Sequence, residues 1–127
     1  MTMAEYVHVV TWNVNGLLDK IRRGAILRHA KRLGADILMI QETHLMGNKT
    51  PFLARYGFSQ VYHAGFTRGS RGVAILIWRH VSLKMDTVQT DRLGRSIMIS
   101  GVREGRPCSL CCVYAPPIII GFLGINY

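Results

Sequence analysis

The sequence is short of acidic residues and contains no long apolar run. Seven Asp and Glu stand against sixteen Lys and Arg in 127 residues, which gives a formal net charge of +9. Twelve of those sixteen cations are Arg, whose planar guanidinium pairs with phosphate through two hydrogen bonds. We therefore expect a polyanionic partner. The alternative is that the charge only keeps the chain in solution.

No apolar stretch approaches the roughly 18 residues that a membrane-spanning helix needs, so we expect no membrane partner. The first five residues also lack the basic and then apolar pattern of a secretory signal. Only three cysteines occur, Cys108, Cys111 and Cys112, and their odd number argues against a disulfide framework. Cys108 and Cys111 lie three apart in an expected strand and so face opposite sides, without a second ligand pair for zinc. An intracellular, reducing compartment is expected.

The length and the 49% hydrophobic content fit one domain with its own core. Apolar periodicity predicts two helices and seven strands. The helices are expected at 19–33 and 51–56, and the strands at 7–12, 37–41, 59–64, 73–78, 83–90, 96–102 and 108–114. In the first helix Ile26, Ala30 and Leu33, with Ile21 and Ala25 behind them, keep helical spacing and are expected on the apolar side. A strand–helix–strand start followed by hairpins predicts an α/β (α+β) fold with a mixed sheet, and residues 103–107 read as a five-residue hairpin loop.

Polar side chains follow three of these strands where each strand ends. Asn13 and Asn15 follow the first, Glu42 follows the apolar strand 37–41, and Tyr114 closes the last. Ligands of open α/β sheets bind beyond the carboxyl ends of the strands. Mg²⁺ favours one or two carboxylates, with water and phosphate completing its shell. The alternative is that these are a solvated loop charge, turn residues and a packing tyrosine.

Four motifs in this order and spacing resemble a known family: residues 11–17 (TWNVNGL), 40–45 (IQETHL), 72–76 (GVAIL) and 113–116 (VYAP). They resemble the N-terminal half of the endonuclease/exonuclease/phosphatase superfamily, and most of all the apurinic-type endonuclease domain of LINE-type retrotransposons. The resemblance implies the N-terminal half of a DNase I-like four-layer α/β sandwich. Residues 1–116 would be a partial domain of this family, and residues 117–127 an apolar tail outside it.

The resemblance also implies a chemistry, the hydrolysis of phosphodiesters with Mg²⁺ or Mn²⁺. Glu42 is then the metal-ligating carboxylate. Asn13 belongs to the network of hydrogen bonds around metal and phosphate, and Asn15 takes the neighbouring position at the metal. Tyr114 corresponds to the active-site tyrosine near the scissile phosphate. The retrotransposon members nick one DNA strand and leave a 3′-hydroxyl that primes reverse transcription.

The implied partner is the phosphate backbone of DNA, which makes the nucleus the expected location. Arg68 and Arg71, in the loop before residue 72, are plausible backbone contacts. The alternative is that they are solvated loop charges.

The sequence departs from the family pattern in its C-terminal motifs. It contains neither the Gly-Asp-x-Asn segment that orients the attacking water nor the Ser-Asp-His of the family, and Pro117 stands where an Asn is usual. Positioned acid–base groups each contribute about 10²–10⁴ in rate. We therefore expect a truncated member that is inactive alone, with most of the second sheet missing and one sheet face uncovered. A second chain that completes the sandwich is a candidate partner.

Two other functions stay open. One is a non-catalytic, basic nucleic-acid-binding module, which the net charge favours. The other is a related activity of the same superfamily on phosphoinositides or sphingomyelin. The basic balance and the QETHL motif disfavour that second alternative.

Overall fold

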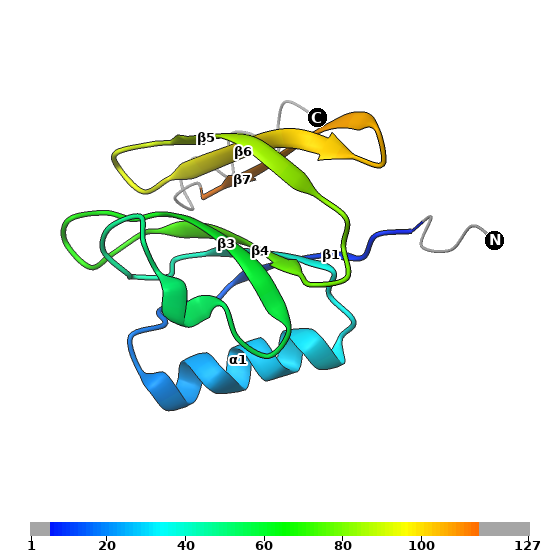
Figure 1. Ribbon diagram of the computed structural model, residues 1–127. Coiled ribbons are helices and arrows are strands. Elements are labelled where there is room, and N and C mark those ends of the chain that lie inside the picture. Colours follow the sequence, from blue (N-terminus) through cyan, green and yellow to red (C-terminus); the bar gives the residue numbers. More distant parts are fainter. Residues whose placement is uncertain (1–5, 115–127) are drawn as a thin grey trace, which may run out of the picture.

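The computed structural model describes residues 6–114 and arranges them in three layers (Figure 1). The elements in chain order are β1 (Val9–Asn13), α1 (Lys20–Arg32), β2 (Ile37–Gln41), the 3₁₀ turn η1 (Pro51–Leu53), β3 (Phe58–Ala64), β4 (Val73–Trp78), β5 (Lys84–Thr90), β6 (Ser96–Arg103) and β7 (Arg106–Val113). One sheet has the order β1-β2-β4-β3, and α1 lies against one of its faces. The strands β5-β6-β7 form a second sheet over the other face (Figure 1).

The four-stranded sheet is mixed, as predicted. β1 and β2 are parallel, and β4 runs antiparallel to β2 and to β3. β2 and β4 are buried on both faces, because alternate side chains enter different cores. Leu38 and Ile40 pack with the buried side of α1, whereas Ile37 and Ile75 pack with the second sheet. The arrangement agrees with the predicted α/β class and with half of a layered sandwich.

Helix α1 forms where it was predicted, and its buried side includes Ile26 and Ala30 as expected. Its buried residues are Ile26, Leu27 and Ala30. Ile21 is 82% exposed and Leu33 is 54% exposed, so the expectation that they face the apolar side is wrong. The helix starts at the side chain of Asp19, whose Oδ1 accepts a hydrogen bond from the Ile21 N–H at 3.0 Å. No helix within residues 6–114 is both long enough and apolar enough to cross a membrane.

The expectation of one sheet with an uncovered face is also wrong. β5, β6 and β7 make a separate antiparallel sheet. Ile97, Ile99 and Cys112 from this sheet share a core with Ile75 and Ile77 of β4. Alternation along each strand predicts which side chains face inward, but it does not tell which strands belong to one sheet.

The tail at residues 117–127 and the boundary at residue 116 lie outside the described residues.

The hairpin between β6 and β7 is tighter than predicted. The two strands pair as far as Arg103 and Arg106, which leaves a turn of two residues. Those residues, Glu104 and Gly105, have φ of +50° and +77°, as a type I′ turn requires. Cys108 faces the core between the sheets and Cys111 is exposed, so the two cysteines lie on opposite sides as expected.

Candidate active site

The candidate site lies at the edge of the sheet where the parallel strands β1 and β2 end. Asn13 pairs with Gln41 in the strand register. The pairing continues past the strands, because Gly16 N–H donates to Glu42 O at 2.7 Å and Leu17 N–H donates to Thr43 O at 2.8 Å. The turn that follows β1 is therefore held beside the segment that follows β2.

This backbone pairing brings the predicted carboxylate and amide together. Asn13 Nδ2 donates a hydrogen bond to Glu42 Oε2 at 2.7 Å. The backbone N–H of Asn15 donates to Asn13 Oδ1 at 3.2 Å, which turns the amide nitrogen of Asn13 toward Glu42. The Nε2 atom of His44 lies 3.4 Å from Glu42 Oε1. The structure thus places Asn13, Asn15 and Glu42 in one group and adds His44 to it.

The backbone at this edge adopts a conformation that L-residues rarely take. Glu42 has φ of +57° and His44 has φ of +60°, with Asn15 at +51° and Arg71 at +57°. These are four of the six non-glycine residues with positive φ in the described part of the chain. Each left-handed residue costs roughly 1–2 kcal/mol. Such strain concentrates at functional sites, where the surrounding structure must hold it in place.

A buried network holds the strained segment. Thr43, fully buried between Glu42 and His44, lies 2.7 Å from His63 Nε2 through its Oγ1. His63 Nδ1 lies 2.7 Å from the carbonyl oxygen of Gly47. A carbonyl only accepts, so Nδ1 carries the proton and Nε2 accepts from the Thr43 hydroxyl. Burial lowers the pKa of His63, outweighing the opposite effect of the Gly47 bond, so the ring is held neutral.

Gly72 closes the other side of this segment. Thr43 N–H donates to Gly72 O at 3.1 Å, and His44 N–H donates to Arg71 O at 2.7 Å. Gly72 has φ of +96°, and a Cβ atom there would lie 2.2 Å from Thr43 Oγ1. Only glycine fits this close approach. Sequence reasoning missed the support from Thr43, His63 and Gly72, and strand alternation, which turns His63 inward, was the one available signal.

Gln41 connects this edge to the second sheet. Its Nε2 donates to Thr11 Oγ1 at 2.9 Å and contacts Cys112 Sγ at 3.3 Å. Burial raises the pKa of the Cys112 thiol, which stays neutral and donates to Ile40 O at 3.6 Å. Tyr114 follows two residues later and packs, half-buried, against the core between the sheets. It therefore lies at the same end, but within residues 6–114 no hydrogen bond joins its phenol to Asn13 or Glu42.

The two predicted arginines differ in their relation to the site. Arg71 adjoins it, because its carbonyl accepts from His44 and its guanidinium lies 4.6 Å from the centre of the Phe66 ring. Arg71 Nη1 also reaches Leu93 O at 3.4 Å. Arg68 is exposed in the loop between β3 and β4. A contact of either arginine with DNA stays a prediction.

The donors at this edge fit one kind of metal ion and not another. Within residues 6–114 no three His, Cys, Asp or Glu side chains come together as a metal-binding cluster, so a closed zinc site is not formed by them. Glu42 offers one carboxylate, and the Asn13 side chain lies beside it with its amide nitrogen toward Glu42 and its oxygen bonded to the Asn15 N–H. That set fits Mg²⁺, which accepts one or two carboxylates when water and phosphate fill its remaining positions.

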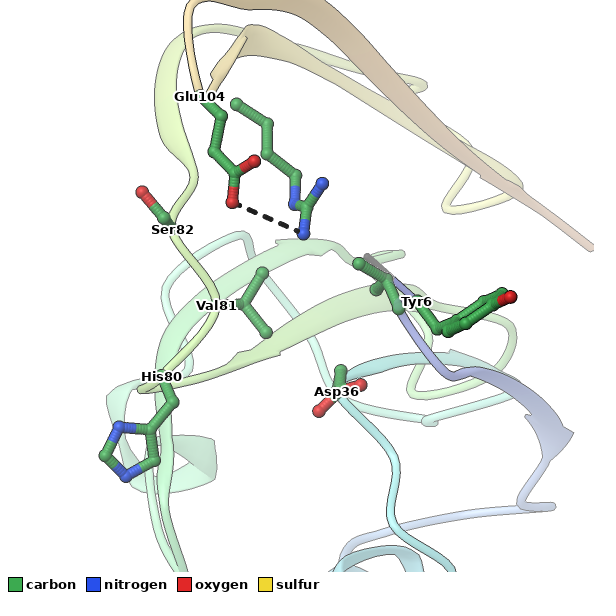
Figure 2. Close-up of a pocket in the computed structure, with 8 residues that line it drawn as sticks. Tyr6, Asp36, His80, Val81, Ser82 and Glu104 are labelled. Atoms are coloured by element: carbon green, nitrogen blue, oxygen red, sulfur yellow. Dashed lines mark ion pairs between the residues drawn. The ribbon is translucent and has the colours of Figure 1, made fainter. Parts of the chain in front are cut away.

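A cavity of about 150 Å³ lies at the opposite end of the sheet (Figure 2). Tyr6, Asp36 and His80 line it together with Arg103 and Glu104, whose side chains form an ion pair at 3.8 Å. Asp36 Oδ2 accepts a hydrogen bond from the His8 N–H at 2.9 Å. None of the predicted site residues lines this cavity.

Comparison with known proteins gives a family and a fold. The sequence profile of the Endonuclease/Exonuclease/phosphatase family matches residues 10–117. An AP endonuclease from Archaeoglobus fulgidus is 25% identical, with a TM-score of 0.65, and the match covers 87% of this chain and 42% of that one. The 3′ phosphatase NExo from Neisseria, bound to a product DNA hairpin, is also 25% identical, with a TM-score of 0.63 and coverages of 86% and 41%.

The endonuclease domain of TRAS1, a telomere-specific non-LTR retrotransposon, shares the fold at 16% identity. Its TM-score is 0.60, and the match covers 95% of this chain and 51% of that domain. The chain thus spans about half the length, or less, of these solved structures.

Proposed function

This chain belongs to the endonuclease/exonuclease/phosphatase family, and from that premise we propose that it is the N-terminal half of a Mg²⁺-dependent phosphodiesterase that nicks DNA. The observation that carries the proposal is the 2.7 Å hydrogen bond between Asn13 and Glu42 at the carboxyl ends of two parallel strands. Family members generally use divalent metals. The similar structures include nucleases and a phosphatase bound to DNA.

Each residue has a role in this proposal. Glu42 would hold Mg²⁺, which supplies neutralisation of charge at a phosphoryl oxygen. Asn13 fixes the direction of the Glu42 carboxylate, and Asn15 fixes Asn13 in turn through its backbone N–H. Asn15 would also offer its amide oxygen to the ion. The phenol of Tyr114, at the same end of the sheet, would donate to a non-bridging oxygen of the scissile phosphate.

We propose that these 127 residues do not catalyse the reaction alone. The Gly-Asp-x-Asn and Ser-Asp-His segments are absent from them. Without those groups no side chain orients the attacking water or manages protons at the phosphorane, and each such group contributes about 10²–10⁴ in rate. A further polypeptide carrying those segments would complete the site, either in the same chain or as a second one.

The proposed family branch is the LINE-type retrotransposon endonuclease, with action on nuclear DNA. The IQETHL and VYAP motifs support it, and the retrotransposon endonuclease among the similar structures agrees in fold.

A plasmid-nicking assay tests the function. The 127-residue chain is expected to leave supercoiled plasmid intact in Mg²⁺. A version extended through both missing segments should convert plasmid to the nicked form, and Glu42→Gln in that version should abolish the conversion. If the 127-residue chain nicked plasmid and Glu42→Gln abolished that nicking, the proposal that activity requires the missing half would be contradicted. Nicking by the extended version that survives Glu42→Gln would contradict the role of Glu42.

A second candidate function is a non-catalytic nucleic-acid-binding module. The net charge of +9 favours it. Contact with about six phosphates would give a slope near −5 for log K against log salt. This candidate requires DNA binding that is independent of Mg²⁺ and of Glu42, in the extended version as well as in the short chain.

A further inference from the structure

Helix α1 carries a high density of exposed positive charge. Six of the sixteen Lys and Arg lie within its thirteen residues, and no Asp or Glu does. We call the five exposed members the α1 basic face: Lys20, Arg22, Arg28, Lys31 and Arg32. The sixth, Arg23, is half-buried.

The cations of this face form no ion pair within the described residues. The ion pairs within residues 6–114 join His44 to Glu42, Arg95 to Asp91 and Arg103 to Glu104, and none of them includes a residue of α1. Unpaired cations on one surface create a local positive potential, which attracts a polyanion more strongly than the same charges dispersed over the molecule.

Aromatic rings beside the helix hold two of these cations in place. The guanidinium carbon of Arg28 lies 5.4 Å from the centre of the Tyr56 ring, and Arg28 Nη1 donates to the Tyr56 hydroxyl at 3.0 Å. The Nζ atom of Lys31 lies 5.8 Å from the centre of a Trp78 ring. Side chains already ordered in this way lose less conformational freedom when they bind a ligand.

The basic face begins beside the candidate active site. Arg22 Nη1 donates to the carbonyl of Gly16, and Arg23 Nη1 donates to Leu17 O at 3.1 Å. Both carbonyls belong to the turn that follows Asn13. From there α1 extends for about 20 Å, a length over which one DNA strand presents roughly six phosphates.

We propose that the α1 basic face binds the backbone of double-stranded DNA that flanks the scissile phosphate. The choice of DNA rests on the proposed function, and the choice of a polyanion rests on the charges. A membrane surface fits less well, because interfacial helices bury an apolar side in the lipid, whereas the apolar side of α1 is occupied by the sheet.

The test compares two double variants of equal charge change. Arg28→Gln with Arg32→Gln alters the α1 basic face, and Lys84→Gln with Arg106→Gln alters exposed cations on the second sheet. Arg28→Gln loses the contact with Tyr56, and the relief of a like-charge repulsion between residues four apart on one helix offsets part of that cost, so the variant should still fold. A urea unfolding curve of each variant checks this. Binding of a short fluorescent DNA duplex is measured by anisotropy over about 50–200 mM KCl.

The α1 variant should flatten the slope of log K against log salt by about 1.8, since each phosphate contact contributes about 0.9. The sheet variant should leave the slope close to that of the unaltered chain. Equal effects of the two variants, or none from the α1 variant, would overturn the proposal. A preference for an RNA duplex, or for vesicles of phosphatidylcholine and phosphatidylserine, that depends on Arg28 and Arg32 would overturn the choice of DNA.

A Mn²⁺ titration of Glu42→Gln separates this proposal from the proposed function. If Glu42→Gln abolishes Mn²⁺ binding while the α1 variant binds DNA normally, the basic face fails and the metal site stands. If the α1 variant loses DNA affinity while Glu42→Gln still binds Mn²⁺, the basic face stands and the metal site fails.

Discussion

The two ends of the four-stranded sheet are built from the same strands and differ in their backbone. At the carboxyl end of β1 and β2, the non-glycine residues Asn15, Glu42, His44 and Arg71 all have positive φ. At the amino end, the described part of the chain has two such residues, Tyr56 and Glu104, and both lie in turns. Strain without a turn requirement therefore occurs at the end that carries the carboxylate.

The two ends also differ in the polar hydrogen bonds that support their backbone. The hydroxyl of Thr43 and the ring of His63 form a buried hydrogen-bonded pair under the strained segment. At the amino end the main polar contacts are simpler, with His8 N–H donating to Asp36 Oδ2 and Trp78 N–H donating to Asp36 O. A segment that costs free energy to hold needs support of this kind, whereas an ordinary strand start does not.

Gly72→Ala, at the carboxyl end of the sheet, should have the largest effect on stability. The added Cβ would meet Thr43 Oγ1 at 2.2 Å, at a φ of +96°. Overpacking and strain together should lower the free energy of unfolding by about 3 kcal/mol, as measured by urea denaturation. Gly105→Ala, at the other end with φ of +77° and nothing within 4 Å, should cost about 1 kcal/mol. Equal losses of unfolding free energy in the two variants would contradict the proposed difference in backbone strain between the two ends.

His63→Phe should weaken the support without adding a backbone clash. It leaves Gly47 O and the Thr43 hydroxyl without their buried partner. The free energy of unfolding should fall by about 2 kcal/mol in the same assay. His80→Phe at the exposed amino end is the matched control and should change it by less than about 0.5 kcal/mol. If His63→Phe lowered the free energy of unfolding no more than this control does, His63 would not support the strained segment.

Asn13→Ala should weaken the metal site with little effect on folding. The Glu42 carboxylate would lose the amide that orients it, and losing such a partner typically costs about tenfold or more in metal affinity. A Mn²⁺ titration measures this. Asp36→Asn removes a hydrogen-bonded carboxylate at the other end and should leave Mn²⁺ affinity unchanged. If Asp36→Asn lost more Mn²⁺ affinity than Asn13→Ala, the metal would bind at the amino end of the sheet, and the proposed site would be contradicted.

The smallest expected effect is a pH dependence of stability from His63. Burial lowers the pKa of this residue in the folded state, so between the folded pKa and the unfolded value near 6.5 the unfolded chain binds more protons. Stability should be complete above about pH 6.5 and should fall as the pH drops toward the folded pKa, by at most about 1.4 kcal/mol per pH unit. The comparison is made by denaturation at several pH values. His63→Gln should flatten this part of the curve, and an unchanged slope would exclude His63 as its source.

Much of the fold follows from the sequence, because apolar periodicity is local. Strand β2 matches its predicted bounds, and α1 forms between the cap at Asp19 and Leu33. The hairpin of β6 and β7 was predicted, but the separation of β5, β6 and β7 into a second sheet was not, because it depends on contacts distant in sequence. The buried side of α1 was predicted in part. Ile26 and Ala30 are buried as expected, whereas Ile21 and Leu33 are apolar but face solvent, which intrinsic hydrophobicity does not reveal.

The candidate site was predictable in part. Strand ends and motifs pointed to Asn13 and Glu42, and the structure joins them by a hydrogen bond. The positive φ of Glu42 and His44 was not predictable, since these residue types give no signal for it. Nor was the pairing of Thr43 with His63, because a histidine twenty residues away can meet a threonine only through the fold.

Paramagnetic broadening by Mn²⁺ in an NMR spectrum of the 127-residue chain tests the central claim most directly. Amide signals of residues 13–15 and 42–44 should broaden first, signals of residues 80–82 should stay sharp, and Glu42→Gln should abolish the effect. Broadening centred on residues 80–82, or unchanged broadening in Glu42→Gln, would contradict a metal site at the carboxyl end of the sheet.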